Sequence, residues 1–196
     1  MSIQLTEDHE DFLKEFLNIS MGKAANKLAE LIGLHVTLSV PQIMLASPEQ
    51  LNRQLSYEDT FHYTQQSFFG ELSGEVITLL GKDGGALLAR EMCSLDSEAQ
   101  LEASELMDCM LDVSNILSGA SLRGLCQQIE MDTRIQPPVI LMPSRTPLPM
   151  DKWEQSLMLQ VSFLVDAVKF ESETIICFAD NGLVQLLHRL DSYLQE

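Results

Sequence analysis

The sequence predicts an α/β fold made of two similar halves, residues 1–96 and 97–196, around a mainly antiparallel sheet. The first observation is the order of the predicted elements, because helix, three strands and helix occurs twice along the 196 residues. The second is a self-alignment, in which a shift of 97 residues pairs Asp11 with Asp108 and Asn18 with Asn115 without gaps. About eight identities in roughly 37 aligned positions exceed the two or three that average composition gives by chance. We therefore expect one duplicated domain with a pseudo-twofold axis.

The first half is predicted to contain, in order, a helix over 8–32, a strand over 35–45, a short helix over 47–54, two strands over 60–70 and 72–81, and a short helix over 84–92. Leu13 and Leu17 belong to the apolar face that favours the first helix. Pro41 makes the first strand irregular or places it at an edge, because proline cannot donate a ladder hydrogen bond. Glycine and serine separate the two later strands, which are therefore expected to pair antiparallel.

The second half is predicted to contain a long helix over 97–130, strands over 133–143, 155–167 and 173–180, and a closing helix over 181–194. Its first strand again contains a proline, at position 138, and its other two are rich in aliphatic and β-branched residues. The order of elements therefore matches that of the first half.

One face of the first helix carries residues that an ordinary solvated face does not need. These residues are Asp11, Glu15, Asn18 and Gly22. At 100° per residue they span an arc of about 60°. Asn costs up to about 0.7 kcal/mol and Gly about 1 kcal/mol relative to Ala inside a helix, so a merely solvated face would use Glu, Lys or Gln.

The same face recurs in the second half. Its residues are Asp108, Asp112, Asn115 and Gly119. An asparagine and a glycine that repeat in phase indicate a duplicated functional site. The two glycines have two interpretations: they remove side-chain bulk where a partner approaches, or they allow the helix to pack closely against the protein's own sheet.

Composition and charge argue against several other functions. A formal net charge of −17 disfavours nucleic acid as a partner, because its phosphates require Lys and Arg. No run approaches the 18 or so apolar residues that span a bilayer, so no membrane insertion is expected. The four cysteines lack CxxC spacing and sit inside apolar runs, which favours reduced, buried thiols in a cytoplasmic protein. The histidines also lack metal-ligand spacing, so no metal or cofactor of the protein's own is expected.

The repeated face suggests that it assists a reaction whose phosphoryl group and metal ion lie on another protein. A carboxylate and a carboxamide one turn apart do not make a nucleophilic triad, and no His or Cys lies near them in sequence. A carboxamide can both donate and accept a hydrogen bond, so it can orient a water molecule. The carboxylate can bind a cation on another protein. This pair suits phosphoryl hydrolysis in which the partner supplies the phosphoryl group and the metal ion.

The motif resembles the signature of the CheC, CheX and FliY phosphatase family, D-x-x-x-E-x-x-N followed after 22 residues by a proline. In this sequence Asp11, Glu15, Asn18 and Pro41 fit it fully, with 22 residues between the last two. The second copy, Asp108, Asp112, Asn115 and Pro138, keeps this spacing but has Asp in place of Glu. With two copies and no added switch domain, the chain looks most similar to CheC.

The resemblance implies that Asn18 and Asn115 orient the hydrolytic water at the aspartyl phosphate of a CheY-like receiver, in chemotaxis or another two-component pathway. Glu15 would pair with the receiver's active-site lysine, and Mg²⁺ would come from the receiver. The implied fold is CheC-like and pseudo-twofold, with the two long helices exposed on one side. Asp112 reaches about 1.3 Å less far than a glutamate, so the second site is expected to be weaker.

The residues that surround each Asn form the expected docking surface for the receiver: Asp11, Gly22, Asp108 and Gly119. Two other functions stay open beside the phosphatase. One is a non-catalytic adaptor of the same fold that binds a receiver, and the other is an assembly component similar to the flagellar switch proteins. A CheD-like deamidase is a further partner compatible with the resemblance.

Overall fold

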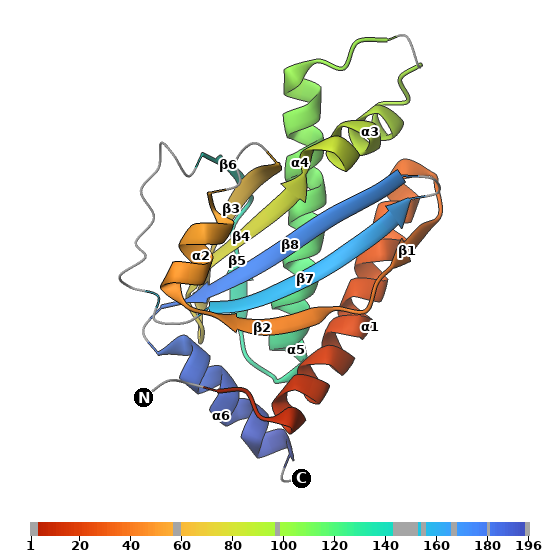
Figure 1. Cartoon of the computed structure of the whole chain (residues 1–196). Helices are drawn as coiled ribbons and strands as arrows, with labels where there is room; N and C mark the ends of the chain where they lie inside the picture. The colour runs from red at the N-terminus through yellow and green to blue at the C-terminus, as the bar shows by residue number, and fades with distance from the viewer. Residues whose placement is uncertain are drawn as a thin grey trace.

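The computed structural model describes residues 4–56, 60–96, 99–142, 153, 156–165, 168–179 and 181–194. Its centre is an eight-stranded antiparallel sheet in the order β1-β7-β8-β4-β3-β5, with β2 also on β7 and β6 also on β3 (Figure 1). The strands are β1 Val36–Leu38, β2 Gln42–Ala46, β3 Phe61–Gly70, β4 Gly74–Gly81, β5 Thr133–Ile135, β6 Val139–Leu141, β7 Ser156–Val165 and β8 Val168–Phe178. The predicted α/β class with a mainly antiparallel sheet is confirmed.

The helices match the expected order closely. They are α1 Glu7–Ile32, α2 Pro48–Gln54, α3 Lys82–Met92, α4 Ala103–Ser118, the π-helical segment η1 Gly119–Arg123, α5 Gly124–Gln128 and α6 Gly182–Leu194. The segments α4, η1 and α5 follow one another without a break and form the second long helix.

The two halves of the chain exchange strands. The short strands β1 and β2 of the first half pair with β7, whereas β5 and β6 of the second half pair with β3. The long strands β4 and β8 join the halves in the middle of the sheet. The division into repeats at 96–97 stays a prediction, and residues 97 and 98 lie outside the described residues.

Three expectations about element boundaries are wrong. The strand expected over 173–180 begins earlier, at Val168, because its pairing with β7 extends as far as Val165 of that strand. Within the described residues, each half has four strands rather than three. The segments 35–45 and 133–143 are each broken into two short strands near the motif proline, because proline has no N–H for the ladder. The long helix of the second half begins at Ala103 rather than Ser97. It begins there because the Glu105 carboxylate accepts a hydrogen bond from the backbone N–H of Glu102, at 2.9 Å, and closes the first turn.

The long helices α1 and α4–α5 cover one face of the sheet, and α2 lies against the other (Figure 1). Side chains on the central strands alternate accordingly: Val76 and Leu80 of β4 belong to clusters under the long helices, and Ile77 and Leu79 belong to the cluster on the other face. Both long helices are thus held by their apolar sides, which leaves their polar sides outward.

The amino-terminal end of α1 is fixed by two sets of contacts. Thr6 and His9 form a reciprocal capping box, which satisfies backbone N–H groups in the first turn. The buried His9 ring also contacts Asp191 of α6, with 2.8 Å between Nε2 and Oδ1. Phe12 and Tyr193 pack their rings at 6.3 Å between centroids. The motif of the first half therefore begins on a well-anchored turn.

All four cysteines are free thiols, as expected from their spacing. The expectation that they are buried is confirmed for three of them and wrong for Cys93, which is exposed because it caps the carboxyl end of α3. Burial raises the pKa of Cys109 and of Cys177 to about 12, so both stay protonated at neutral pH.

Candidate functional site

The first predicted site lies on the outward face of α1. Asp11, Glu15 and Asn18 are all exposed there, as their helical spacing requires. The Asp11 carboxylate lies 3.8 Å from Lys14 Nζ, and the Asp11 side chain is 84% exposed, so this ion pair is loose. Asn18 has no hydrogen bond to any residue that the structure describes, so its carboxamide is available to a partner on both its donor and its acceptor side.

The second predicted site lies on α4. Asp108, Asp112 and Asn115 are exposed on it. The spacing therefore places each carboxylate and its asparagine together in both halves, but the two sites stay separate. Asn115 borders a groove between α1 and α4–α5, whereas Asn18 is not among the residues that line it.

The glycines beside each asparagine meet almost nothing. A Cβ added at Gly22 would have no neighbouring atom within 4 Å. At Gly119 it would meet only the Arg123 guanidinium, at 4.0 Å. Close packing against the protein's own sheet therefore does not explain either glycine, and the interpretation as an approach surface for another molecule is favoured.

The structure adds a buried partner to the second site. Gln66 of β3 is only 2% exposed, and its Nε2 donates to the Gln136 carbonyl at 2.9 Å and to Asn115 Oδ1 at 3.4 Å. Its Oε1 accepts from the Ser118 hydroxyl. Gln66 thus links the motif asparagine to the chain segment that leads into Pro138, two residues beyond Gln136.

Sequence reasoning missed this network. Ser114 and Ser118 lie on the buried side of α4, and Ser114 makes a hydrogen bond to Thr64 of β3. The 97-residue alignment pairs these serines with Leu17 and Met21 of α1, which are apolar and buried. The second copy thus has two serines where the first copy has large apolar residues. This difference is the signal that a polar partner lies beneath the second helix.

We expect Gln66→Leu to lower the free energy of unfolding by about 1–3 kcal/mol, because it removes the hydrogen bonds that the buried Gln66 amide makes with the Gln136 carbonyl and the Ser118 hydroxyl. Denaturant titration measures this change. Gln65→Leu is the matched control, since Gln65 is the neighbouring glutamine, is partly buried, and has a side chain that bonds only to Glu75 among the residues that the structure describes. The side-chain amide NMR signals of Asn115 should also shift in the Gln66 variant and not in the control. Equal losses of stability in both variants would contradict the role of the network.

Other chemistry is limited in the part of the chain that the structure describes. No cluster of three or more His, Cys, Asp and Glu side chains there is arranged to hold a metal ion. Among the same residues, no helix combines the length and the apolar character needed to cross a membrane. What each site presents is an exposed carboxylate, an exposed carboxamide and an open helical face.

Comparisons with known proteins give a family match over part of the chain and a fold match over most of it. A model of the CheC-like family matches residues 9–45, which include the first motif and Pro41. A comparison with curated protein sequences gives no significant match. Among solved structures, FliY from Thermotoga maritima superposes with a TM-score of 0.71 at 19% identity, over 97% of this chain and 99% of that chain.

Two further solved structures have the same architecture. The FliM middle domain from H. pylori gives a TM-score of 0.66 at 9% identity, over 94% of this chain and 99% of that chain. A chain of the CheX–CheY–BeF3–Mg complex from Borrelia burgdorferi gives 0.53 at 14% identity, over 84% of this chain and 98% of that chain. At such identities the likeness shows the fold, and the expected CheC-like fold is confirmed. The particular likeness to CheC stays a prediction.

Proposed function

We propose that this chain is a phosphatase that hydrolyses the aspartyl phosphate of a CheY-like receiver domain. Asn18 and Asn115 each orient a water molecule for attack on the phosphoryl group. Glu15, and less effectively Asp112, bind a lysine of the receiver and hold it in the reactive pose. The receiver supplies the phosphoryl group and the Mg²⁺ that neutralises its charge.

One observation carries this proposal: both long helices have an exposed carboxylate, an exposed carboxamide and a glycine whose added Cβ would meet no other side chain closer than 4.0 Å in the described part of the chain. A side chain that only orients water needs neither a shifted pKa nor a deep pocket, because the partner closes the site when it docks. The match of the CheC-like family model to residues 9–45 supports the first site in particular.

A non-catalytic adaptor is the second candidate function. The FliM middle domain shares the fold, and a fold alone does not decide between an enzyme and a binding protein. The Asp at position 112, where the motif has Glu, also favours a second site that binds without hydrolysing. A CheD-like partner stays a prediction for either function.

The test follows phosphate release from several phosphorylated receivers of the source organism, with and without this protein. We expect faster release from at least one receiver, and only while Mg²⁺ is present. The double variant Asn18→Ala/Asn115→Ala is the control, because it removes both carboxamides from exposed positions and leaves the core intact. Binding of a receiver without any acceleration would favour the adaptor instead.

A further inference from the structure

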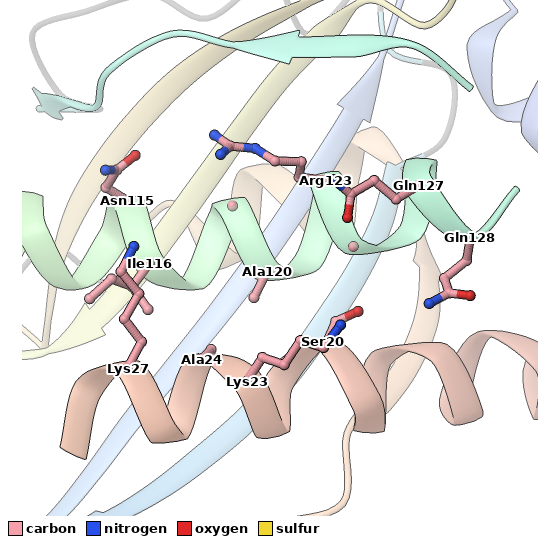
Figure 2. Close-up of a pocket in the computed structure, with 12 residues that line it drawn as sticks. Ser20, Lys23, Ala24, Lys27, Asn115, Ile116, Ala120, Arg123, Gln127 and Gln128 are labelled. Carbon is pink, nitrogen blue, oxygen red and sulfur yellow. The ribbon is translucent and has the colours of Figure 1, made fainter. Parts of the chain in front are cut away.

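A groove of about 210 Å³ runs between α1 and the α4–α5 helix (Figure 2). Small residues form its floor, among them Ala24, Ala120 and Gly124. Gly124 is required there, since an added Cβ would lie 2.2 Å from the Ser20 hydroxyl of α1. Because the two helices approach closely at this floor, longer side chains on either side form the walls.

The walls are positively charged. Lys23 and Lys27 rise from α1, and Arg123 lies at the end of the π-helical segment on the other wall. None of the three has an ion pair or a hydrogen bond with any residue that the structure describes. No Asp or Glu is among the twelve residues that line the groove.

This charge distribution is unusual for the chain as a whole, which has 29 acidic and only 12 basic Lys and Arg residues. A groove with three cations and no acid is therefore an exception on a strongly acidic protein. All three cations line the same groove, so an anion that entered it would interact favourably with each of them.

Arg123 connects this groove to the second site. Its side chain extends back along the helix toward Asn115 (Figure 2), and its Nη2 lies 4.0 Å from where a Cβ of Gly119 would stand. The 97-residue alignment places the uncharged Asn26 at the equivalent position of α1. The second site therefore has a cation that the first site lacks.

We propose that this groove binds the acidic phosphoryl pocket of the receiver, with Arg123, Lys23 and Lys27 contacting its carboxylates and phosphoryl oxygens while Asn115 faces the aspartyl phosphate. The inference rests on the proposed function for the identity of the partner. Charge complementarity supports it, because a receiver pocket that holds a phosphorylated aspartate and Mg²⁺ is lined by carboxylates. At this site the cations replace part of the docking contribution that the shorter Asp112 loses.

The experiment measures binding of receivers loaded with BeF3 and Mg²⁺, a stable mimic of the phosphorylated state, to the full chain by calorimetry. We expect Arg123→Gln and the pair Lys23→Gln/Lys27→Gln each to weaken binding about two- to fivefold, as for partly exposed ion pairs. The triple variant should lose about tenfold or more and show a weaker dependence of binding on salt. Arg53→Gln is the matched control, because it removes one exposed charge on α2, at the other face of the sheet.

The outcomes separate this inference from the proposed function. If receivers are dephosphorylated but the groove variants bind as well as the Arg53 control, the groove proposal is overturned and the phosphatase stands. If binding depends on the groove but the Asn18→Ala/Asn115→Ala variant hydrolyses normally, the catalytic proposal fails and the groove stands. Absence of binding to every receiver overturns both.

Discussion

Asn18→Ala is expected to remove most of the acceleration of receiver dephosphorylation, and Asn115→Ala much less. Both asparagines can orient water, but orientation helps only when the receiver is docked in the reactive pose, and a misplacement near 1 Å can cost on the order of 100-fold in rate. Glu15 has the full reach of the motif to a receiver lysine. Asp112 is one methylene shorter, and a partly exposed ion pair contributes only about 0.2–1 kcal/mol at best.

The surroundings of the two carboxamides also favour a larger contribution to hydrolysis from the first site than from the second. Asn18 is exposed and has no hydrogen bond within the described part of the chain, so its whole carboxamide can serve the water and the phosphoryl group. The oxygen of Asn115 is shared with Gln66 Nε2 at 3.4 Å. The second site therefore has a more constrained and partly occupied carboxamide, even where Arg123 assists docking.

Asp112→Glu supplies the converse test, since it restores the motif of the first copy. We expect it to raise the rate of hydrolysis, and most visibly in an Asn18→Ala background in which only the second site contributes. Single-turnover measurements with saturating protein separate this effect from a change in affinity. A larger loss from Asn115→Ala than from Asn18→Ala would make the second site the working one and refute the argument from carboxylate length.

The elements that the sequence predicts well are those with strong periodicity. The apolar stripe of α1 and the alternating residues of β3 and β4 each follow from a local pattern, and those elements are where they were expected. The breaks between β1 and β2 and between β5 and β6 were not expected, because a proline weakens a strand without showing where its neighbours stop pairing. The exchange of short strands between the halves depends on long-range packing that no local pattern encodes.

The candidate sites also contain some features that local spacing predicts and others that only the folded chain creates. Helical spacing alone places Glu15 with Asn18 and Asp112 with Asn115, because both members of each pair lie on one helix. Gln66 lies on a strand 49 residues before Asn115, so only the folded chain brings the two together. The groove cations were missed for a related reason: Lys23 and Arg123 come from different helices, and each is unremarkable in its own segment.

Gly22→Leu should reduce hydrolysis at the first site by about tenfold or more and leave the fold at least as stable, and Gly119→Leu should reduce hydrolysis at the second site by a similar factor. Glycine costs about 0.8–1 kcal/mol relative to alanine inside a helix, and leucine ranks close to alanine. Because the space around Gly22 is open, we expect the leucine variant to be at least as stable as the original protein. The same side chain stands one turn from Asn18, where a docked receiver has to approach.

Two variants at position 22 and one control make this test sharp. Gly22→Ala adds one methyl group and Gly22→Leu adds four carbons. The control, Glu30→Leu, places an apolar side chain two turns farther along α1. Activity should fall in the order of added bulk at position 22 and stay unchanged in the control, while thermal unfolding shows no loss of stability in any variant. Stability that falls with bulk at position 22 would instead favour internal packing as the reason for the glycine. Full activity of the Gly22→Leu variant would mean that the receiver does not approach this face, and the surface that the two halves share would need another partner.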